Sequence, residues 1–428
     1  MCFKENTEAT EASGVPANSA KALDLGGTVR DAPPSCTLQR VLPLLRAVGI
    51  TRVANITGLD QVGVPTWMIV RPLARSLTVS QGKGSTHELA KLSGIMESIE
   101  LYHAEHFTPQ GEWAPLSQFA KIDGYIDPAL LAVRSDATLD FEREIYWVQG
   151  HDLVSGRPKW IPHELFDADC TKKSTNPFFC QSSNGLSSGN SVEESILHGL
   201  CEVIERDQVS FWLETAQYTK QIANTLVSPD SVDDPICLSL INKCREAGLD
   251  VLIWYATTNI DIPVFTCTVA DRAECTFYPI RTSGHGCHPV KAVALSRAIT
   301  EALQSRLTHI AGTRDDMYWE DYLQGEFLCS LEANKSWLNK LLLSEDAIDY
   351  RTLPELEKYT KIRDLLEHVK TKLIAVHCDS IVFVDLFQES LGIPVTYVCV
   401  PKLEQTIVGP LYRSGTRMLD HLKRLKQC

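Results

Sequence analysis

Glutamates recur at helical spacing in three separate stretches of the chain. These stretches contain Glu97 with Glu100, Glu202 with Glu205, and Glu301 one turn after Arg297. Residues three or four positions apart lie on one face of a helix, so each stretch would present its polar side chains together. Apolar residues border each set, which predicts partial burial, and buried like charges need compensation. Mg²⁺ would compensate them, because it binds carboxylate oxygens and shares its other positions with phosphates.

Cationic and amide side chains accompany these glutamates. Arg206 follows the second pair, Gln304 lies three residues after Glu301, and Lys83 stands in a glycine-bearing run. Carboxylates with a lysine and arginines together describe a site for a nucleoside triphosphate. The run Gly82-Lys83-Gly84 lacks the Gly-x-x-x-x-Gly-Lys-Ser/Thr frame, so a P-loop NTPase is excluded.

Three long helices must position these groups, and the periodicity predicts them over residues 86–106, 191–212 and 289–310. The glycine-bearing segments that precede them are 80–85, 182–190 and 283–286. Glycines permit close approach of the backbone to a ligand, and helix N-termini favour phosphate. We therefore predict phosphate-binding loops there. Ser85-x-x-Glu88 and Ser191-x-x-Glu194 are capping-box patterns, and Pro289 suits a first helical position.

β-Branched runs predict a sheet component beside these helices. A short helix is expected around residues 42–48, and strands at 52–56, 64–70, 144–149, 251–255, 263–269, 276–280, 381–386 and 395–400. The expected fold class is α/β (α+β), with helices packed on antiparallel or mixed sheets. Residues 1–37, rich in small, polar and proline residues, are predicted to form a flexible N-terminal arm before a single domain over 38–428.

Composition narrows the possible partners and compartment. The chain of 428 residues carries a net charge of −13, which disfavours nucleic acid or an anionic membrane surface as a partner. Its 14 cysteines are scattered and include no C-x-x-C pair, which indicates reduced thiols in the cytoplasm. No apolar run approaches the ~20 residues of a membrane span. A homodimer is the default expectation for a soluble enzyme.

Several features have alternative explanations. A single Glu-x-x-Glu pair is more often a solvated helix face, and only its recurrence on three helices favours bound metal. His285 and His288 suggest a metallohydrolase, although few histidines lie in the acidic helices. Cys287 could carry sulfur, but a buried structural thiol is more common. Cys170 and Cys180 flank two lysines that could lower a thiol pKa.

The ordered blocks of polar residues resemble the YcaO family over residues 38–403. The matching blocks are 80–83 with Glu97 and Glu100, 184–206, 297–304 and the strand that ends at 398–401. This resemblance implies a YcaO-like fold, with mixed or antiparallel sheets and long helices converging on a non-classical ATP site. In that site, carboxylates from several helices hold Mg²⁺ ions that bridge the phosphates of ATP.

The family pattern also implies a set of site residues. The magnesium ligands would be Glu97, Glu100, Glu202, Glu205 and Glu301. The nucleotide would contact Lys83, Ser187, Asn190, Glu194, Arg206, Arg297 and Gln304. In the implied reaction a nucleophile adds to a peptide-backbone amide, and the resulting oxyanion takes the γ-phosphoryl group of ATP.

The nucleophile decides the product, and three segments bear on it. Segments 49–53, 286–289 and 312–316 are similar to YcaO proteins that work with a TfuA partner in thioamide formation. Ring-forming members resemble one another in a proline-rich carboxyl tail, whereas residues 422–428 here are basic and predicted helical. The resemblance implies a peptide or protein substrate, a sulfide source and a TfuA-type partner. The alternatives are an azoline-forming cyclodehydratase of Cys, Ser or Thr residues and a non-catalytic nucleotide-binding scaffold.

Overall fold

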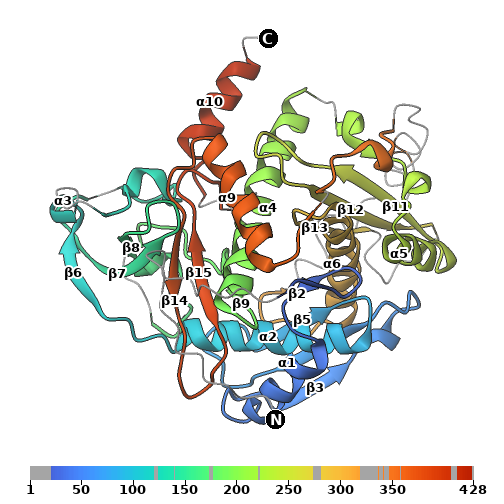
Figure 1. The fold of residues 1–428 in the computed structure, drawn as a ribbon, viewed down its shortest axis with the longest axis horizontal. Coiled ribbons are helices and arrows are strands. Elements are labelled where there is room, and N and C mark those ends of the chain that lie inside the picture. The colour runs from blue at the N-terminus through green and yellow to red at the C-terminus, as the bar shows by residue number, and fades with distance from the viewer. Residues whose placement is uncertain are drawn as a thin grey trace.

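The structure is a computed structural model that describes residues 21–119, 124–138, 140–172, 177–219, 222–272, 281–318, 336, 341, 347–356, 358–405 and 412–426. Within these ranges the strands pair antiparallel in four sheets, and long helices pack against them (Figure 1). The predicted mixed class of helices on antiparallel sheets is confirmed.

The two larger sheets stand on either side of the longest helix. The six-stranded sheet comprises β6 (Gly111–Pro115), β7 (Glu144–Asp152), β14 (Val382–Asp385), β15 (Val395–Cys399) and β9 (Leu186–Ser188), with β8 (Pro158–Pro162) paired to β7. The four-stranded sheet comprises β10 (Leu226–Val227), β11 (Leu249–Tyr255), β12 (Val264–Asp271) and β13 (Arg281–Cys287). The smaller units are the sheet of β3 (Arg52–Asn55), β4 (Thr66–Val70) and β5 (Val79–Lys83) and the hairpin of β1 (Leu23–Asp24) and β2 (Val29–Arg30).

The three predicted long helices are α2 (His87–Glu105), α4 (Val192–Thr219) and α6 (Lys291–Ala311). The remaining described helices are α1 (Pro34–Val41), α3 (Leu116–Phe119), α5 (Pro235–Glu246), α9 (Ile362–Ala375) and α10 (Thr416–Leu425). Each long helix packs on the strand that directly precedes it, namely β5, β9 or β13. Figure 1 shows α4 at the centre, with β14 and β15 on one side and β12 and β13 on the other. Three strand–helix units therefore meet around α4.

Residues 80–83 and 283–286 form strands, as do residues 186–188 of the segment 182–190, which corrects the prediction that these segments are loops. A Cβ atom on Gly82 would lie 2.0 Å from the Ala90 carbonyl oxygen, and one on Gly284 would lie 2.2 Å from the Ala302 nitrogen. No side chain fits at such distances. These glycines let each helix lie directly on its strand, so their role is close packing between backbones.

The helix starts agree only partly with the predicted caps. The Ser191 hydroxyl accepts a hydrogen bond from the Glu194 amide at 3.2 Å, as a capping serine should. In α2 the cap is Thr86, because the Ser85 hydroxyl instead donates to the carbonyl of Gly26 in the β1–β2 hairpin. Pro289 lies before the N-cap of α6, which is Val290.

Seven of the eight predicted strands correspond to observed strands, and the eighth, at 276–280, lies outside the described residues. The strands that were not predicted are β1, β2, β5, β6, β8, β9, β10 and β13. Residues 42–48 begin with a short 3₁₀ turn after α1, rather than a helix of their own.

The predicted start of the folded part at residue 38 is too late. Residues 1–20 lie outside the described residues, but residues 21–37 form the β1–β2 hairpin and the first turn of α1. Val29 is buried in the core cluster around α4, and the Arg30 guanidinium lies 3.7 Å from the Glu194 carboxylate. These tertiary contacts hold a segment whose composition alone indicates a mobile arm.

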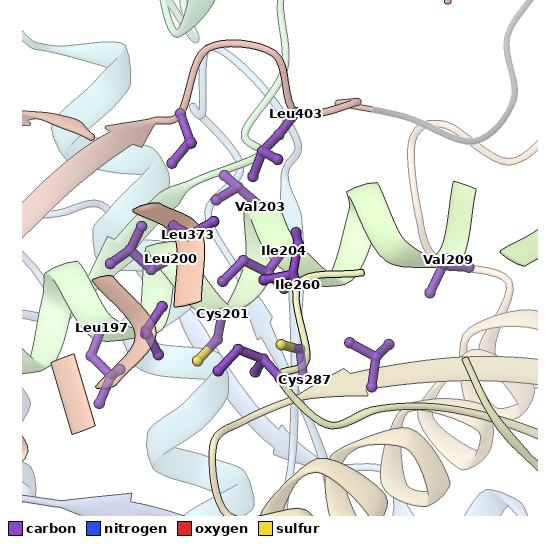
Figure 2. Close-up of a cluster of buried hydrophobic side chains, with 14 of the residues drawn as sticks. Leu197, Leu200, Cys201, Val203, Ile204, Val209, Ile260, Cys287, Leu373 and Leu403 are labelled. Atoms are coloured by element: carbon purple, nitrogen blue, oxygen red, sulfur yellow. The ribbon is translucent and has the colours of Figure 1, made fainter. Parts of the chain in front are cut away.

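The main hydrophobic core surrounds α4 (Figure 2). Leu200, Ile204 and Val209 are fully buried there, and Cys201 lies opposite Cys287 of β13. Because α4 is enclosed along most of its length, its carboxylates at 202 and 205 are also withdrawn from bulk solvent. No described helix is long and apolar enough to cross a membrane.

Candidate functional site

A cavity of about 550 Å³ lies where α2, α4 and α6 converge beside the β1–β2 hairpin. Its walls include eleven of the twelve predicted site residues, namely Lys83, Glu97, Glu100, Asn190, Glu194, Glu202, Glu205, Arg206, Arg297, Glu301 and Gln304. The side chains come from segments more than 200 residues apart in sequence. The three strand–helix units thus bring the predicted polar faces to one place.

Ser187 is the predicted residue that the structure does not place in the cavity wall. It is fully buried, and its hydroxyl donates to the Ser195 carbonyl at 2.8 Å. The neighbouring Ser188 lines the cavity instead and donates to Glu100 Oε1 through its hydroxyl at 2.6 Å and its amide at 2.9 Å. Successive side chains of a strand point to opposite faces, so Ser188, one position further along β9, faces the cavity while Ser187 faces away from it.

Most of the predicted magnesium ligands are partly buried, and the positive charge around them does not offset this burial. Burial, and then the neighbouring glutamates, raise the pKa of Glu100 to about 8 despite its bonds to Ser188. Burial also raises the pKa of Glu97 and of Glu202 to about 7, although nearby cations oppose it. Burial and the charge of Glu301 raise the pKa of Glu205. These carboxylates would be stabilised by an added cation.

Glu301 has the opposite electrostatic environment. Burial disfavours its charge, but the Lys83 ammonium and then the Arg206 guanidinium outweigh burial and lower its pKa to about 2. Lys83 forms an ion pair with one Glu301 oxygen, and the other accepts the His285 amide at 3.2 Å. The cavity therefore holds one neutralised carboxylate beside several that lack a counter-charge.

The residues fit Mg²⁺ that arrives with a nucleotide. Among the described residues, no three His, Cys, Asp or Glu side chains are arranged to hold a metal ion by themselves. Mg²⁺ is usually bound through one or two carboxylates together with substrate phosphates and water. Separated carboxylates with raised pKa values around a large polar cavity match that mode of binding.

The β1–β2 hairpin and the start of α1 supply cavity residues that were missed in the sequence, among them Gly27, Arg30 and Thr37. Glu194 accepts a hydrogen bond from the Asp31 amide at 2.9 Å, and Asn190 Oδ1 accepts one from Thr37 at 2.6 Å. Burial and the Glu194 charge raise the pKa of Asp31 to about 7. Gly26 and Gly27 have positive φ angles of 72° and 88° and form the hairpin turn. Consecutive glycines between short β-forming segments are a known hairpin signal. The small, polar and proline residues of segment 1–37 obscured this signal.

The histidines suggested for a metallohydrolase do not line the large cavity. Burial lowers the pKa of His285 to about 4 and that of His288 to about 3, so both rings are neutral near pH 7. The Nδ1 atom of His285 contacts the Thr266 hydroxyl at 3.1 Å. A different histidine, His198, does line the cavity, and its Nε2 lies 3.4 Å from Arg297 Nη2.

The candidate sulfur-carrying cysteines are not activated. Burial raises the pKa of Cys170 and of Cys180, where an activated thiol would show a lowered pKa. Burial also raises the pKa of Cys287 well above its ordinary value. The structure supports the interpretation of Cys287 as a buried thiol.

The fold and the cavity together define a class of proteins in which carboxylates on three helices, rather than a P-loop, face a large polar cavity. The sequence model of the YcaO cyclodehydratases, described as ATP- and Mg²⁺-binding, matches residues 81–404. The match covers most of the chain, so the protein belongs to the YcaO family. ATP and Mg²⁺ are the cofactors of this family.

One similar protein is an uncharacterised protein from the tfuA 3′ region of Rhizobium leguminosarum bv. trifolii. It is 32% identical over 401 residues, which cover 92% of this chain and 93% of that protein. The high coverage on both sides indicates the same overall organisation.

Two solved structures share the fold. A heterocyclase in complex with substrate and cofactor has a TM-score of 0.74 at 22% identity, over 93% of this chain but only 55% of the heterocyclase. The YcaO protein of Methanopyrus kandleri bound with AMPPCP and Mg²⁺ has a TM-score of 0.68 at 20% identity, over 89% of this chain and 94% of that one. The YcaO-like fold is thereby confirmed.

Proposed function

We propose that this protein uses ATP to phosphorylate the oxygen of a peptide-backbone amide and that sulfur then replaces this oxygen, giving a thioamide. The observation that carries the proposal is the convergence of partly buried carboxylates, most with raised pKa values, with Lys83, Arg206 and Arg297 on one cavity. Phosphoryl transfer needs positioning and charge neutralisation more than a protein nucleophile, and this cavity is built for both.

The cavity residues divide by charge. Glu97, Glu100, Glu202, Glu205 and Glu301 would hold Mg²⁺, which supplies positive charge next to the phosphates. The phosphates would be contacted directly by Lys83, Arg206 and Arg297. The rest of the predicted nucleotide wall comprises Asn190, Glu194 and Gln304. The partial burial of these side chains strengthens each of these interactions.

The proposed reaction is balanced without any further reagent. Hydrosulfide adds to the amide carbon and forms a C–S bond, and the resulting oxyanion attacks the γ-phosphorus of ATP, from which ADP leaves. The C–O bond then breaks, and phosphate leaves with the proton that hydrosulfide brought. Each thioamide formed consumes one ATP and one hydrosulfide and yields ADP and phosphate.

The choice of thioamide over ring formation is supported by similarity. The Rhizobium relative comes from a tfuA region and shares nearly the full length of this chain. We therefore propose a TfuA-type protein as partner and a ribosomally made peptide or a larger protein as substrate.

The test is intact-mass analysis of candidate peptides incubated with the protein, ATP, Mg²⁺, a sulfide source and a TfuA-type partner. A gain of about 16 Da, the difference between sulfur and oxygen, is expected with wild type and not with Glu202→Ala. A loss of about 18 Da without added sulfide would instead establish dehydrative ring closure. Tight ATP binding with neither product in the complete system would identify a scaffold.

A further inference from the structure

A second, much smaller cavity of about 20 Å³ adjoins the large one. Five residues line both cavities, namely Thr28, Arg30, Glu194, His198 and Arg297. Since roughly 10–15 Å³ is enough for one water molecule, the small cavity holds a single water-sized molecule or ion. It is too small for a nucleotide or a peptide, and its shared wall residues place it next to the cavity that would hold them.

The polar wall of this small cavity offers hydrogen-bond donors. Arg297 Nε is buried and has no hydrogen-bond partner among the described residues. His288 Nδ1 accepts the Val290 amide at 3.0 Å, so in the neutral ring the proton is on Nε2, which can donate. Arg297 and His288 therefore bring guanidinium and imidazole N–H donors to the wall of one small cavity.

The only carboxylate in the described wall of the small cavity is already bonded. Glu194 accepts from the Asp31 amide at 2.9 Å and from Asn190 Nδ2 at 3.2 Å, and it lies 3.7 Å from the Arg30 guanidinium. Arg297 adds a second guanidinium to the wall. The charge balance around the cavity suits a small anion.

Two sulfur atoms complete the wall. Cys201 on α4 and Cys287 on β13 are both buried, and their thiols are in hydrogen-bonding contact (Figure 2). Because burial keeps the Cys287 thiol protonated, it places no negative charge against an anion. Sulfur is polarisable, so this side of the cavity favours a soft ligand over a hard one such as fluoride.

We propose that the small cavity binds hydrosulfide, HS⁻, and holds it beside the nucleotide cavity as the nucleophile for amide attack. This inference rests on the proposed thioamide-forming function. The donors of Arg297 and His288 would bind the anion next to the space proposed for the nucleotide and the amide.

Two substitutions test the cavity without removing a residue assigned to the nucleotide. His288→Asn keeps an acceptor for the Val290 amide in its side-chain oxygen but lacks the distal donor. Val293→Ile adds a methyl group to a side chain that lines only the small cavity. Val269→Ile is the matched control, because Val269 is equally buried on β12 and lines neither cavity.

Direct binding is measured with bromide, a soft monoanion, soaked into crystals of the full chain without peptide or partner. We expect an anomalous peak in the small cavity, beside Arg297 and His288, in wild type and in Val269→Ile, and none in Val293→Ile. Absence of the peak in wild type would overturn the anion pocket, whatever reaction the protein catalyses.

The kinetic test uses the complete system and compares the KM for sulfide with the KM for ATP. We expect each pocket variant to raise the KM for sulfide about tenfold, with the KM for ATP nearly unchanged. An unchanged KM for sulfide would overturn this inference but leave thioamide formation intact. Bromide binding with no thioamide from wild type would overturn both the proposed function and the assignment of hydrosulfide.

Discussion

Lys83 is the cation that pairs with the most strongly ionised glutamate of the cavity. It forms an ion pair with Glu301, whose pKa it lowers together with Arg206. Lys83→Met removes this charge from the proposed phosphate site, so Mg²⁺-dependent ATP turnover is expected to fall about 100-fold or more, as for other lost electrostatic stabilisers. The rate of phosphate release in the complete system measures this ATP turnover.

The control for Lys83→Met is Lys91→Met. The Lys91 ammonium lies 5.6 Å from the Trp67 ring centroid, and the residue does not line the cavity. Lys91→Met makes the same change of charge and shape as Lys83→Met, but on α2. Equal turnover in the two variants would show that Lys83 does not act on the phosphates.

Glu202 makes the stability of the metal-free protein depend on pH. Its pKa is about 7 in the folded protein, against an ordinary 4.5. Below pH 4.5 both states are protonated, and as pH rises only the unfolded state releases the proton readily. The free energy of unfolding therefore falls, by on the order of 3 kcal/mol once the pH exceeds the folded-state pKa.

Glu202→Gln should remove the part of this fall that Glu202 contributes, while the other carboxyl groups with raised pKa values keep theirs. Urea unfolding in the presence of a chelator, from pH 4.5 to 8, should show the variant gaining stability over wild type as the pH rises. Glu88→Gln, at an exposed position of α2, serves as the control and should follow wild type. Parallel curves for all three proteins would contradict the prediction.

At the scale of elements, close contact between each long helix and its strand positions the site. On β13, Gly284 lies so near α6 that an added Cβ would meet backbone atoms of Glu301 and Ala302. Gly284→Ala is expected to destabilise the protein by about 3 kcal/mol, because the helix must move away from the strand. It should also weaken ATP binding, since Glu301 moves with α6.

Urea midpoints and ATP titrations measure both effects of Gly284→Ala. The comparison is Gly58→Ala, where an added Cβ meets nothing within 4 Å and the φ angle is not in the left-handed region. That variant should stay within about 0.5 kcal/mol of wild type. A Gly284→Ala protein that is as stable as wild type would show that the contact between α6 and β13 yields easily.

At the scale of the whole molecule, the amino-terminal hairpin closes a cavity that is otherwise made by distant helices. Removal of residues 1–33 deletes β1 and β2, including Arg30 and Asp31, which contact Glu194. The Kd for ATP should rise at least about tenfold, because an ordered wall of the cavity is lost. Isothermal titration measures the Kd.

Truncation at residue 20 is the control for the hairpin deletion, because every described contact stays in place. We expect this shorter truncation to leave the Kd for ATP unchanged. If both truncations weaken ATP binding equally, the hairpin is not the element responsible.

The sequence by itself determined the elements and the polar faces they carry. The spacing of Glu97, Glu100, Glu202, Glu205 and Glu301 predicted three helices with acidic faces, because helical periodicity depends only on neighbours in the chain. β-Branched runs predicted most strands for the same reason. The order of these blocks was enough to indicate the family.

The tertiary structure decided how these elements meet. Ser188 bonds Glu100 across 88 positions, and the Asp31 amide bonds Glu194 across 163. The hairpin wall, the replacement of Ser187 by its neighbour and the raised pKa values all follow from such contacts. Hydrogen bonds and burial between segments far apart in the chain depend on three-dimensional packing, which local sequence patterns do not encode.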